Sequence, residues 1–185
     1  MEYKMTIAGL ERSLPLCKLT EELYIAGFVI FGDAELTVAA AAALLERAPD
    51  YDYLLTAEAK GIPLIHELAR QRGDSKYFVA RKAPKLYMTG LFEVDVDSIT
   101  TAGSQKLYLD TADAALMRGK RILLVDDVIS TGNSLNALER LTEAAGGKVV
   151  GRMSILAEGD AQTRGDIVYL EKLPLFRPDG SIAVI

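Results

Sequence analysis

Apolar and polar positions along the chain form two alternating kinds of segment, which predict strands and helices in turn. An apolar run at Tyr24–Phe31 predicts a strand, and an amphipathic run then predicts a helix whose N-cap is Asp33. Further strands are expected within residues 51–58, 76–82, 121–125, 148–156 and 166–173. Further helices are expected at residues 64–73, closed by Gly73, and at 111–119 and 134–147.

Strands separated by helices of about 10 to 15 residues are typical of βαβ units. The sequence therefore predicts an α/β fold with a mostly parallel, twisted sheet flanked by helices. No linker or repeat divides the chain, so we expect a single domain over residues 1–185. Residues 83–110 show weak periodicity, and we expect a long loop there. The final residues, 180–185, read as a tail or an edge strand.

Composition narrows the functional classes. The net charge is −5, with 21 basic and 26 acidic residues, which argues against a broad nucleic-acid-binding surface. No apolar run approaches the roughly 20 residues that cross a bilayer, so no membrane contact is expected. The single Cys17 cannot form an internal disulfide, and we expect a half-buried thiol in a cytoplasmic protein.

The segment Arg121–Ser134, "RILLVDDVISTGNS", contains the candidate chemistry. A strand that is apolar throughout ends in Asp126 and Asp127, and ligands of parallel sheets bind beyond such carboxyl ends. The following loop offers backbone amides, hydroxyl groups and a helix N-terminus, which together suit a phosphate group. Two carboxylates beside a phosphate site fit a sugar phosphate, because carboxylates accept hydrogen bonds from vicinal hydroxyls.

Three other kinds of site also contain adjacent acids of this type. A Walker-B strand needs a G-x-x-x-x-G-K-[ST] partner, and neither Gly119-Lys120 nor Gly147-Lys148 provides one. A phosphotransfer receiver domain needs more chain after Asp127 than is present. The third is a purely structural acidic turn that caps the next helix.

Three segments, in order, resemble type I phosphoribosyltransferases. "ILLVDDVISTGNS" is similar to the family's phosphoribosyl pyrophosphate (PRPP) signature. "GDAEL", "YDYLLTAEAKGIPL" and "ARKAPKL" look like elements of the adenine phosphoribosyltransferase group. The resemblance covers roughly residues 32–158 and implies Mg²⁺-dependent transfer of 5-phosphoribosyl from PRPP to a purine base.

The resemblance assigns roles around the acid pair. It implies that Asp126 and Asp127 hold the ribose hydroxyls and stabilise positive charge that develops on the ribose. Mg²⁺ would be held through substrate and water, with Asp126 as the protein group that could join them. The expected 5′-phosphate site consists of Val128, Ile129, Ser130, Thr131, Gly132, Asn133 and Ser134.

A second anion site is implied for pyrophosphate. It consists of the loop Ala59, Lys60 and Gly61 together with Arg81, Lys82 and Lys85. Lys60 is counted among the catalytic residues, and a non-proline cis peptide is expected at Ala59–Lys60. In relatives the basic segment reaches the partner subunit's site, so the resemblance implies a homodimer.

Residues 83–110 match the family's mobile lid, with Ser104, Gln105 and Lys106 as candidate contacts. The expected base-binding residues are Phe28, Phe31 and Glu158, and Phe176 is a further stacking candidate. His66 is expected to be a surface or packing residue.

The identity of the base stays open. The arginine that adenine-specific relatives carry before "GDAEL" is absent, and "SITTAG" replaces their acidic lid element. Adenine is favoured, and a 6-oxopurine is the alternative base. The alternative function is a non-catalytic regulatory protein that binds PRPP or a nucleotide on the same fold.

Overall fold

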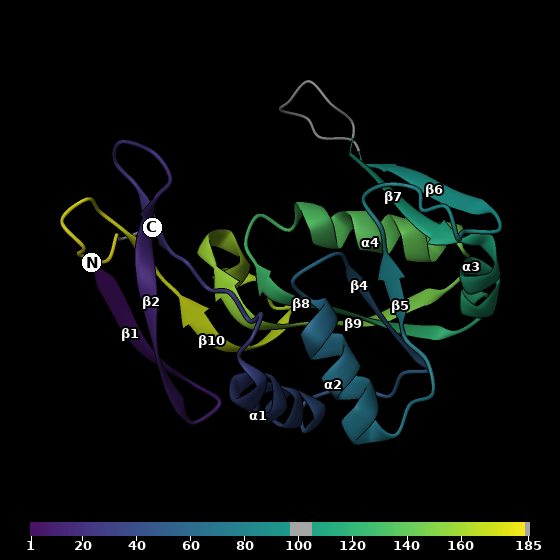
Figure 1. Cartoon of the computed structure of the whole chain (residues 1–185), viewed down its shortest axis with the longest axis horizontal. Coiled ribbons are helices and arrows are strands. Elements are labelled where there is room, and N and C mark those ends of the chain that lie inside the picture. Colours follow the sequence, from purple (N-terminus) through teal and green to yellow (C-terminus); the bar gives the residue numbers. More distant parts are fainter. Residues whose placement is uncertain (97–104, 184–185) are drawn as a thin grey trace.

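The computed structural model of the chain describes residues 1–96 and 105–183. Its centre is a five-stranded parallel sheet in the order β10-β9-β8-β4-β5 (Figure 1). The strands are β4 (Tyr53–Ala57), β5 (Phe78–Ala80), β8 (Arg121–Ile129), β9 (Lys148–Glu158) and β10 (Val168–Leu173). The prediction of an α/β fold with a mostly parallel sheet is confirmed.

Helices cover both faces of this sheet (Figure 1). Helices α1 (Ala34–Leu45) and α2 (Ile62–Arg72) pack on one face, and α3 (Thr111–Met117) and α4 (Asn133–Ala144) lie on the other. Side chains alternate between the two faces along each strand, so Leu123 joins the core under α1 and α2 while Leu124 joins the core under α4. The strands are apolar throughout because both faces are covered.

Two helix boundaries follow the predicted local signals. Asp33 caps α1 by accepting a 3.0 Å hydrogen bond from the backbone nitrogen of Leu36, and Arg12 forms a 2.6 Å ion pair with the same carboxylate. Gly73 ends α2 with a φ of 83°, a left-handed conformation that glycine adopts at little cost. Both predictions are confirmed.

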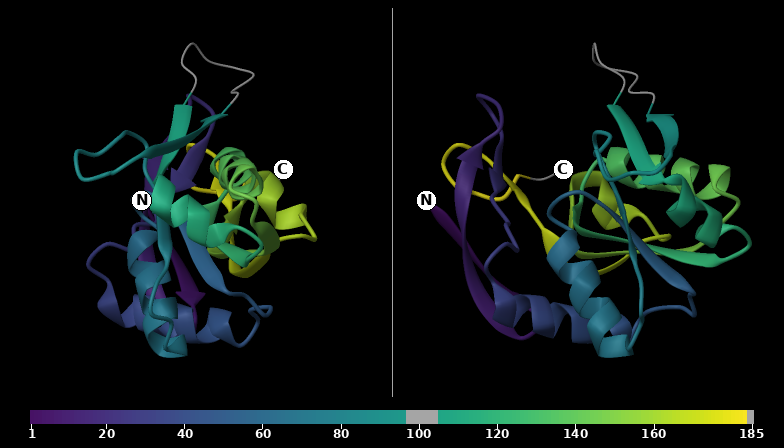
Figure 2. Two further views of the ribbon diagram at one scale, coloured as in Figure 1. Left: turned by 90° about the vertical axis from the view of Figure 1, so that its right-hand side faces the viewer. Right: turned by 45° about the vertical axis from the view of Figure 1, so that its right-hand side comes forward.

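A second sheet is antiparallel and was not predicted. It joins β1 (Glu2–Ile7), β2 (Leu10–Lys18), β3 (Tyr24–Ala26) and β11 (Leu175–Phe176) in the order β1-β2-β3-β11. Figure 2 shows its N-terminal strands (purple) beside the C-terminal segment (yellow) at one end of the molecule. Because β11 follows directly after β10, this sheet lies beyond the carboxyl end of β10. The C-terminal tail adds one isolated bridge, between Ile182 and Phe176.

The predicted strand Tyr24–Phe31 is wrong in length. Strand β3 stops at Ala26, and Phe28 and Ile30 are buried by core contacts without strand pairing. An apolar run signals burial, and burial alone does not require a strand. Cys17, expected to be half-buried, is exposed on β2.

The predicted long loop is also partly wrong. Residues on both sides of positions 97–104 form an antiparallel hairpin of β6 (Leu91–Val96) and β7 (Gln105–Asp110). Leu107 and Leu109 alternate with polar residues and are buried against the core under α3 and α4. The candidate lid residue Ser104 lies outside the described residues, and Lys106 forms a 2.9 Å ion pair with Glu93. Movement of this segment stays a prediction.

Within residues 1–96 and 105–183, no helix combines the length and the hydropathy that a bilayer-crossing segment needs.

Candidate functional site

Two loops follow adjacent parallel strands at one edge of the sheet. Strand β4 pairs with β8, with Leu55 beside Leu124, so the carboxyl ends of both strands lie at the same edge. After β4 the chain passes through Glu58–Gly61 into α2, and after β8 it passes through Ser130–Gly132 into α4. The two loops that the sequence marked as anion sites are therefore neighbours.

The acid pair belongs to β8 itself, which continues past the predicted end at Val125 to Ile129. Asp127 is 2% exposed, and Asp126 is half-buried and faces a cavity. The Asp126 carboxylate accepts a 2.9 Å hydrogen bond from the backbone nitrogen of Asp127. Burial, followed by the charge of Asp127, raises the pKa of Asp126 to about 7. A hydroxyl group or a cation placed here would stabilise the charged form of Asp126.

The cavity beside Asp126 has a volume of about 50 Å³. The loop that sequence analysis assigned to phosphate encloses it: the lining residues are Asp126, Val128, Ile129, Ser130, Thr131, Gly132, Asn133, Ser134 and Leu135. Gly132 precedes α4 with a φ of 80°, and Thr131, Asn133 and Ser134 are exposed. Hydroxyl groups and the N-terminus of a 12-residue helix thus surround a space that suits an anion.

The first loop contacts the acid pair of β8 through Lys60. Its Nζ atom lies 3.1 Å from Oδ2 of Asp127, an ion pair whose alignment falls short of a hydrogen bond. Gly61 makes this approach possible, because a Cβ atom there would lie 2.2 Å from Oγ1 of Thr56 and 3.3 Å from Oδ1 of Asp126. The cis peptide lies at Glu58–Ala59, so the position expected for it, Ala59–Lys60, is wrong by one bond.

Glu58 is a residue of this site that sequence analysis missed. Its carboxylate lies 2.9 Å from Nε of Arg81 and 3.9 Å from Nζ of Lys85, and it accepts a 2.6 Å hydrogen bond from the backbone nitrogen of Lys82. The cationic side chains of Arg81 and Lys85 and the backbone of Lys82 are therefore gathered around one acid at the end of β4. The "AEAKG" segment contains this glutamate, but no local pattern indicates its partners.

The base-binding candidates differ in accessibility. Phe28 is 5% exposed and Phe176 is 1% exposed, and both belong to the core, whereas Phe31 is 50% exposed. Glu158 ends β9 beside β8 and is half-buried. Burial raises the pKa of Glu158, and the charge of Lys60 partly opposes that effect. The exposed His66 contacts Tyr77, with 3.4 Å between Nδ1 and the phenol oxygen, as expected for a surface residue.

A divalent cation fits the acid pair but would need further ligands. In the described part of the chain, no three His, Cys, Asp or Glu residues gather closely enough to hold a metal ion. Two adjacent carboxylates at low exposure, one with a raised pKa, would nevertheless be stabilised by a cation. Mg²⁺ keeps water and substrate oxygens as ligands and uses one or two carboxylates, so Asp126 alone is a sufficient protein contribution.

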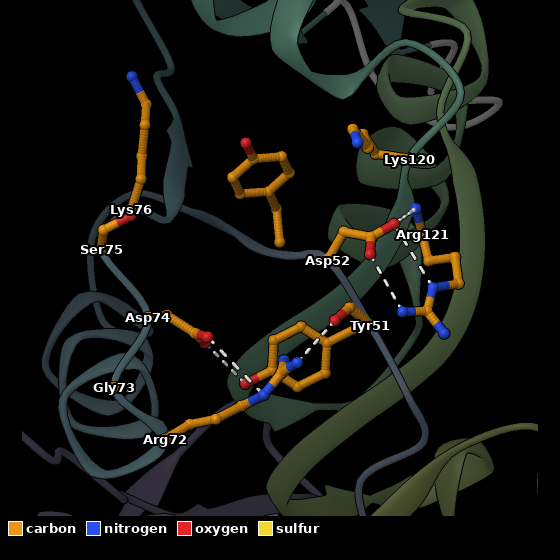
Figure 3. A pocket seen from close by; sticks show the side chains of 10 residues that line it. Tyr51, Asp52, Arg72, Gly73, Asp74, Ser75, Lys76, Lys120 and Arg121 are labelled. Atoms are coloured by element: carbon orange, nitrogen blue, oxygen red, sulfur yellow. Dashed lines mark hydrogen bonds and ion pairs between the residues drawn. The ribbon is translucent and has the colours of Figure 1, made fainter.

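A larger hollow, of about 420 Å³, lies at the opposite edge of the sheet, at the amino ends of β4 and β8. Figure 3 shows that several of its charged side chains pair with one another. Arg121 binds Asp52, and the guanidinium of Arg72 lies 3.6 Å from the centre of the Tyr51 ring, which in turn donates to Asp74. Lys76 binds Asp113 at 2.6 Å. This internal pairing favours a structural role for the hollow.

Comparisons with known proteins agree with this geometry. The family model for the phosphoribosyl transferase domain matches residues 32–171. A hypoxanthine/guanine phosphoribosyltransferase of Methanosarcina mazei is 36% identical over 126 residues, which cover 63% of this chain and 62% of that protein. The corresponding protein of Methanococcus voltae is 34% identical over 113 residues, covering 61% and 56%. The chain thus spans less than two thirds of the length of these relatives.

Solved structures show the same fold. The adenine phosphoribosyltransferase of Thermoanaerobacter pseudethanolicus aligns with a TM-score of 0.64 at 24% identity, covering 77% of this chain and 84% of that one. The adenine phosphoribosyltransferase of Rhodothermus marinus aligns with a TM-score of 0.62 at 23% identity, covering 93% and 94%. The sequence motifs, the parallel sheet and the family match lead to one conclusion: the chain belongs to the phosphoribosyl transferase family.

Proposed function

We propose that the protein is a purine phosphoribosyltransferase, which transfers the 5-phosphoribosyl group of PRPP to a purine base and releases pyrophosphate. The observation that carries this proposal is the 3.1 Å contact between Lys60 and Asp127, because it joins the pyrophosphate loop to the acid pair that directly precedes the phosphate loop. A substrate with phosphoryl groups at both ends of a ribose needs two such loops at this spacing.

In this proposal the 5′-phosphate occupies the cavity enclosed by Val128–Ser134, and the ribose hydroxyls donate to Asp126 and Asp127. The C1′–O bond breaks with its electron pair going to pyrophosphate, and the base nitrogen forms the new bond to C1′ and gives up its proton, which the released pyrophosphate or water accepts. Positive charge develops on the ribose during this exchange. The two carboxylates would stabilise that charge in surroundings with little water.

The departing pyrophosphate would bind to the amides of Ala59, Lys60 and Gly61 and to the cations around Glu58. Before substrate binds, Lys60 occupies the Asp127 carboxylate. A pyrophosphate group carries more negative charge than a carboxylate and would draw Lys60 away. The Asp127 oxygen would then be available to a ribose hydroxyl. Lys60 thus couples binding of the pyrophosphate group to release of the Asp127 carboxylate for the ribose.

Mg²⁺ would supply positive charge to the pyrophosphate oxygens, with Asp126 as the protein group beside it. Since the pKa of Asp126 is about 7, substrate binding with Mg²⁺ should release up to about half a proton per site at neutral pH.

The base would lie near Phe31 and Glu158, the first of which is accessible for stacking. A carboxylate at Glu158 accepts from the amino group of adenine, and the protonated form, which its raised pKa favours, donates to a 6-oxo group. The named archaeal relatives use hypoxanthine and guanine, while the named solved structures are adenine enzymes. We keep adenine as the favoured base and a 6-oxopurine as the alternative. A cytoplasmic homodimer is part of the proposal.

The test is incubation with PRPP, Mg²⁺ and one base at a time, namely adenine, hypoxanthine, guanine, xanthine, uracil or cytosine. Nucleotide and pyrophosphate should form in equal amounts with a purine. Asp127→Asn should strongly reduce turnover while it changes the melting temperature little. Tight PRPP binding without turnover of any base would instead identify the regulatory alternative. A monomer mass in size-exclusion chromatography with light scattering would contradict the proposed homodimer.

A further inference from the structure

The proposed phosphate loop contains no positive charge of its own. None of the residues from Val128 to Ser134 is a lysine or an arginine, and two aspartates precede them. A phosphate monoester carries close to two negative charges at neutral pH. Lys60, the cation on the other loop, lies on Asp127. A cation near the far end of the phosphate loop would therefore matter for binding.

Arg164 is placed at that end of the loop. It follows the 3₁₀ helix η1 (Gly159–Thr163), and its Nη1 atom would lie 2.7 Å from a Cβ atom on Gly132. Gly132 is the last residue before α4, where the backbone amides converge. The absence of a side chain at Gly132 thus lets a guanidinium group approach the backbone of the phosphate loop closely.

Asp166 fixes the orientation of this guanidinium. It accepts from Nε of Arg164 at 2.9 Å and from Nη2 at 2.7 Å, which is a bidentate contact. Nη1 makes no hydrogen bond within residues 1–96 and 105–183, and it is the atom beside Gly132. Asp166 also lies 3.5 Å from Arg152 of β9, which pairs with Glu139 of α4. A chain of ion pairs therefore ties Arg164 to the strand and the helix that border the loop.

We propose that Arg164 supplies the positive charge for the phosphoryl group bound at Val128–Ser134, and that Asp166 is its positioning residue. This inference rests on the proposed function, because it assigns a further residue to the same phosphate site. Arg164 is not among the residues that line the cavity, so it acts through its charge across Gly132. Its side chain is 30% exposed, and its effect should therefore weaken as salt concentration rises.

The test measures binding of ribose 5-phosphate and, separately, of pyrophosphate by calorimetry at low and moderate salt. Arg164→Gln should weaken ribose 5-phosphate binding about tenfold at low salt, as expected for the loss of one partly screened charge. Arg164→Lys, which keeps the charge but loses the bidentate contact with Asp166, should lose less affinity than Arg164→Gln. The affinity for pyrophosphate should not change in either variant. General damage to the fold would instead lower the affinity for both ligands.

Arg47→Gln is the matched control. Arg47 is exposed and donates to the carbonyl of Tyr169, so the variant removes one arginine charge without touching the loop. Binding of ribose 5-phosphate by Arg164→Gln at the wild-type level, or equal losses in the Lys and Gln variants, would overturn the inference while the proposed function stands. No binding of ribose 5-phosphate by the wild-type protein would overturn both.

Discussion

Nζ of Lys60 lies 3.1 Å from Oδ2 of Asp127, and the two partners differ sharply in exposure. The side chain of Lys60 is 47% exposed, whereas that of Asp127 is 2% exposed. The carboxylate has therefore lost most of its water, while the ammonium has kept much of its own. The pair stabilises the resting protein mainly because it compensates a buried negative charge.

Lys60→Met should consequently destabilise the protein. The substitution leaves Asp127 buried without a partner, and we expect a loss of about 1–2 kcal/mol in the free energy of unfolding, less than for a fully buried pair because water reaches Lys60. Urea denaturation at pH 7 measures the loss. The double variant Lys60→Met/Asp127→Asn should regain most of it, since the neutral amide needs no counter-charge.

Lys4→Met is the control for this cycle. Lys4 pairs with Glu11 at 3.9 Å, and both side chains are more than 70% exposed, so its removal should cost less than about 0.5 kcal/mol. A Lys60→Met loss no greater than the Lys4→Met loss would show that Asp127 tolerates burial without Lys60.

Asp126→Asn should remove a loss of unfolding free energy that occurs in the wild-type protein as the pH rises. The pKa of Asp126 is 3.8 in a model peptide and about 7 in the folded protein, so the unfolded chain releases this proton first as the pH rises. The wild-type protein therefore loses stability from Asp126 between about pH 4 and pH 7, and the loss is complete above pH 7. Relative to wild type, Asp126→Asn should gain about 1–3 kcal/mol between pH 4.5 and pH 8.

Unfolding free energies of both proteins at pH 4.5, 6 and 8 test this expectation. Asp50→Asn is the control, because the side chain of Asp50 is 97% exposed. A difference between Asp126→Asn and wild type that stays constant across these pH values would show that Asp126 is ionised throughout in the folded protein.

Gly61→Ala should disturb the site through a steric contact. The added Cβ would meet Oγ1 of Thr56 at 2.2 Å, far inside normal contact, and Thr56 is fully buried and unable to swing outward. We expect a loss of about 1–3 kcal/mol in stability together with a weaker affinity for pyrophosphate. Adding Thr56→Ala removes the colliding oxygen and should restore much of both quantities. No improvement in the double variant would place the cause of the damage in the loop backbone instead.

Local signals made much of this arrangement predictable. Asp33 before an amphipathic run, Gly73 after another, and two acids at the end of an apolar strand each act within a few residues of the feature that they determine. The loop Val128–Ser134 was therefore identified from the sequence, and the cavity it encloses agrees with that prediction. The parallel order of β4 and β8 followed from their helical crossovers.

Contacts between distant segments were not predictable in the same way. Strand β11 pairs with β3 although nearly the whole chain separates them, and no local pattern encodes that partner. The contacts from Glu58 to Arg81 and Lys85 cross from one strand end to another. The β6–β7 hairpin is a different case, because the alternation of Leu107 and Leu109 with polar residues was visible but short.

Glu58 lies among the cations proposed to bind pyrophosphate. Its carboxylate therefore either holds these cations in place or competes with pyrophosphate for them. Glu58 accepts a 2.6 Å hydrogen bond from the backbone nitrogen of Lys82. A carboxylate that only competed with pyrophosphate would not need this bond, so the contact favours the role in which Glu58 holds the cations in place. Glu58→Ala should then weaken pyrophosphate binding about tenfold, because ordering each long cationic side chain on binding costs on the order of 1 kcal/mol. Glu58→Gln should weaken it less, since the amide oxygen still accepts from Lys82.

Calorimetric titration with pyrophosphate separates the two roles. Glu11→Ala, which removes an exposed glutamate from β2, is the matched control and should leave the affinity unchanged. If Glu58→Ala bound pyrophosphate more tightly than wild type, Glu58 would be a competitor that pyrophosphate displaces. Because removal of one acid lowers the affinity in the first case and raises it in the second, the sign of the change alone decides which role Glu58 has.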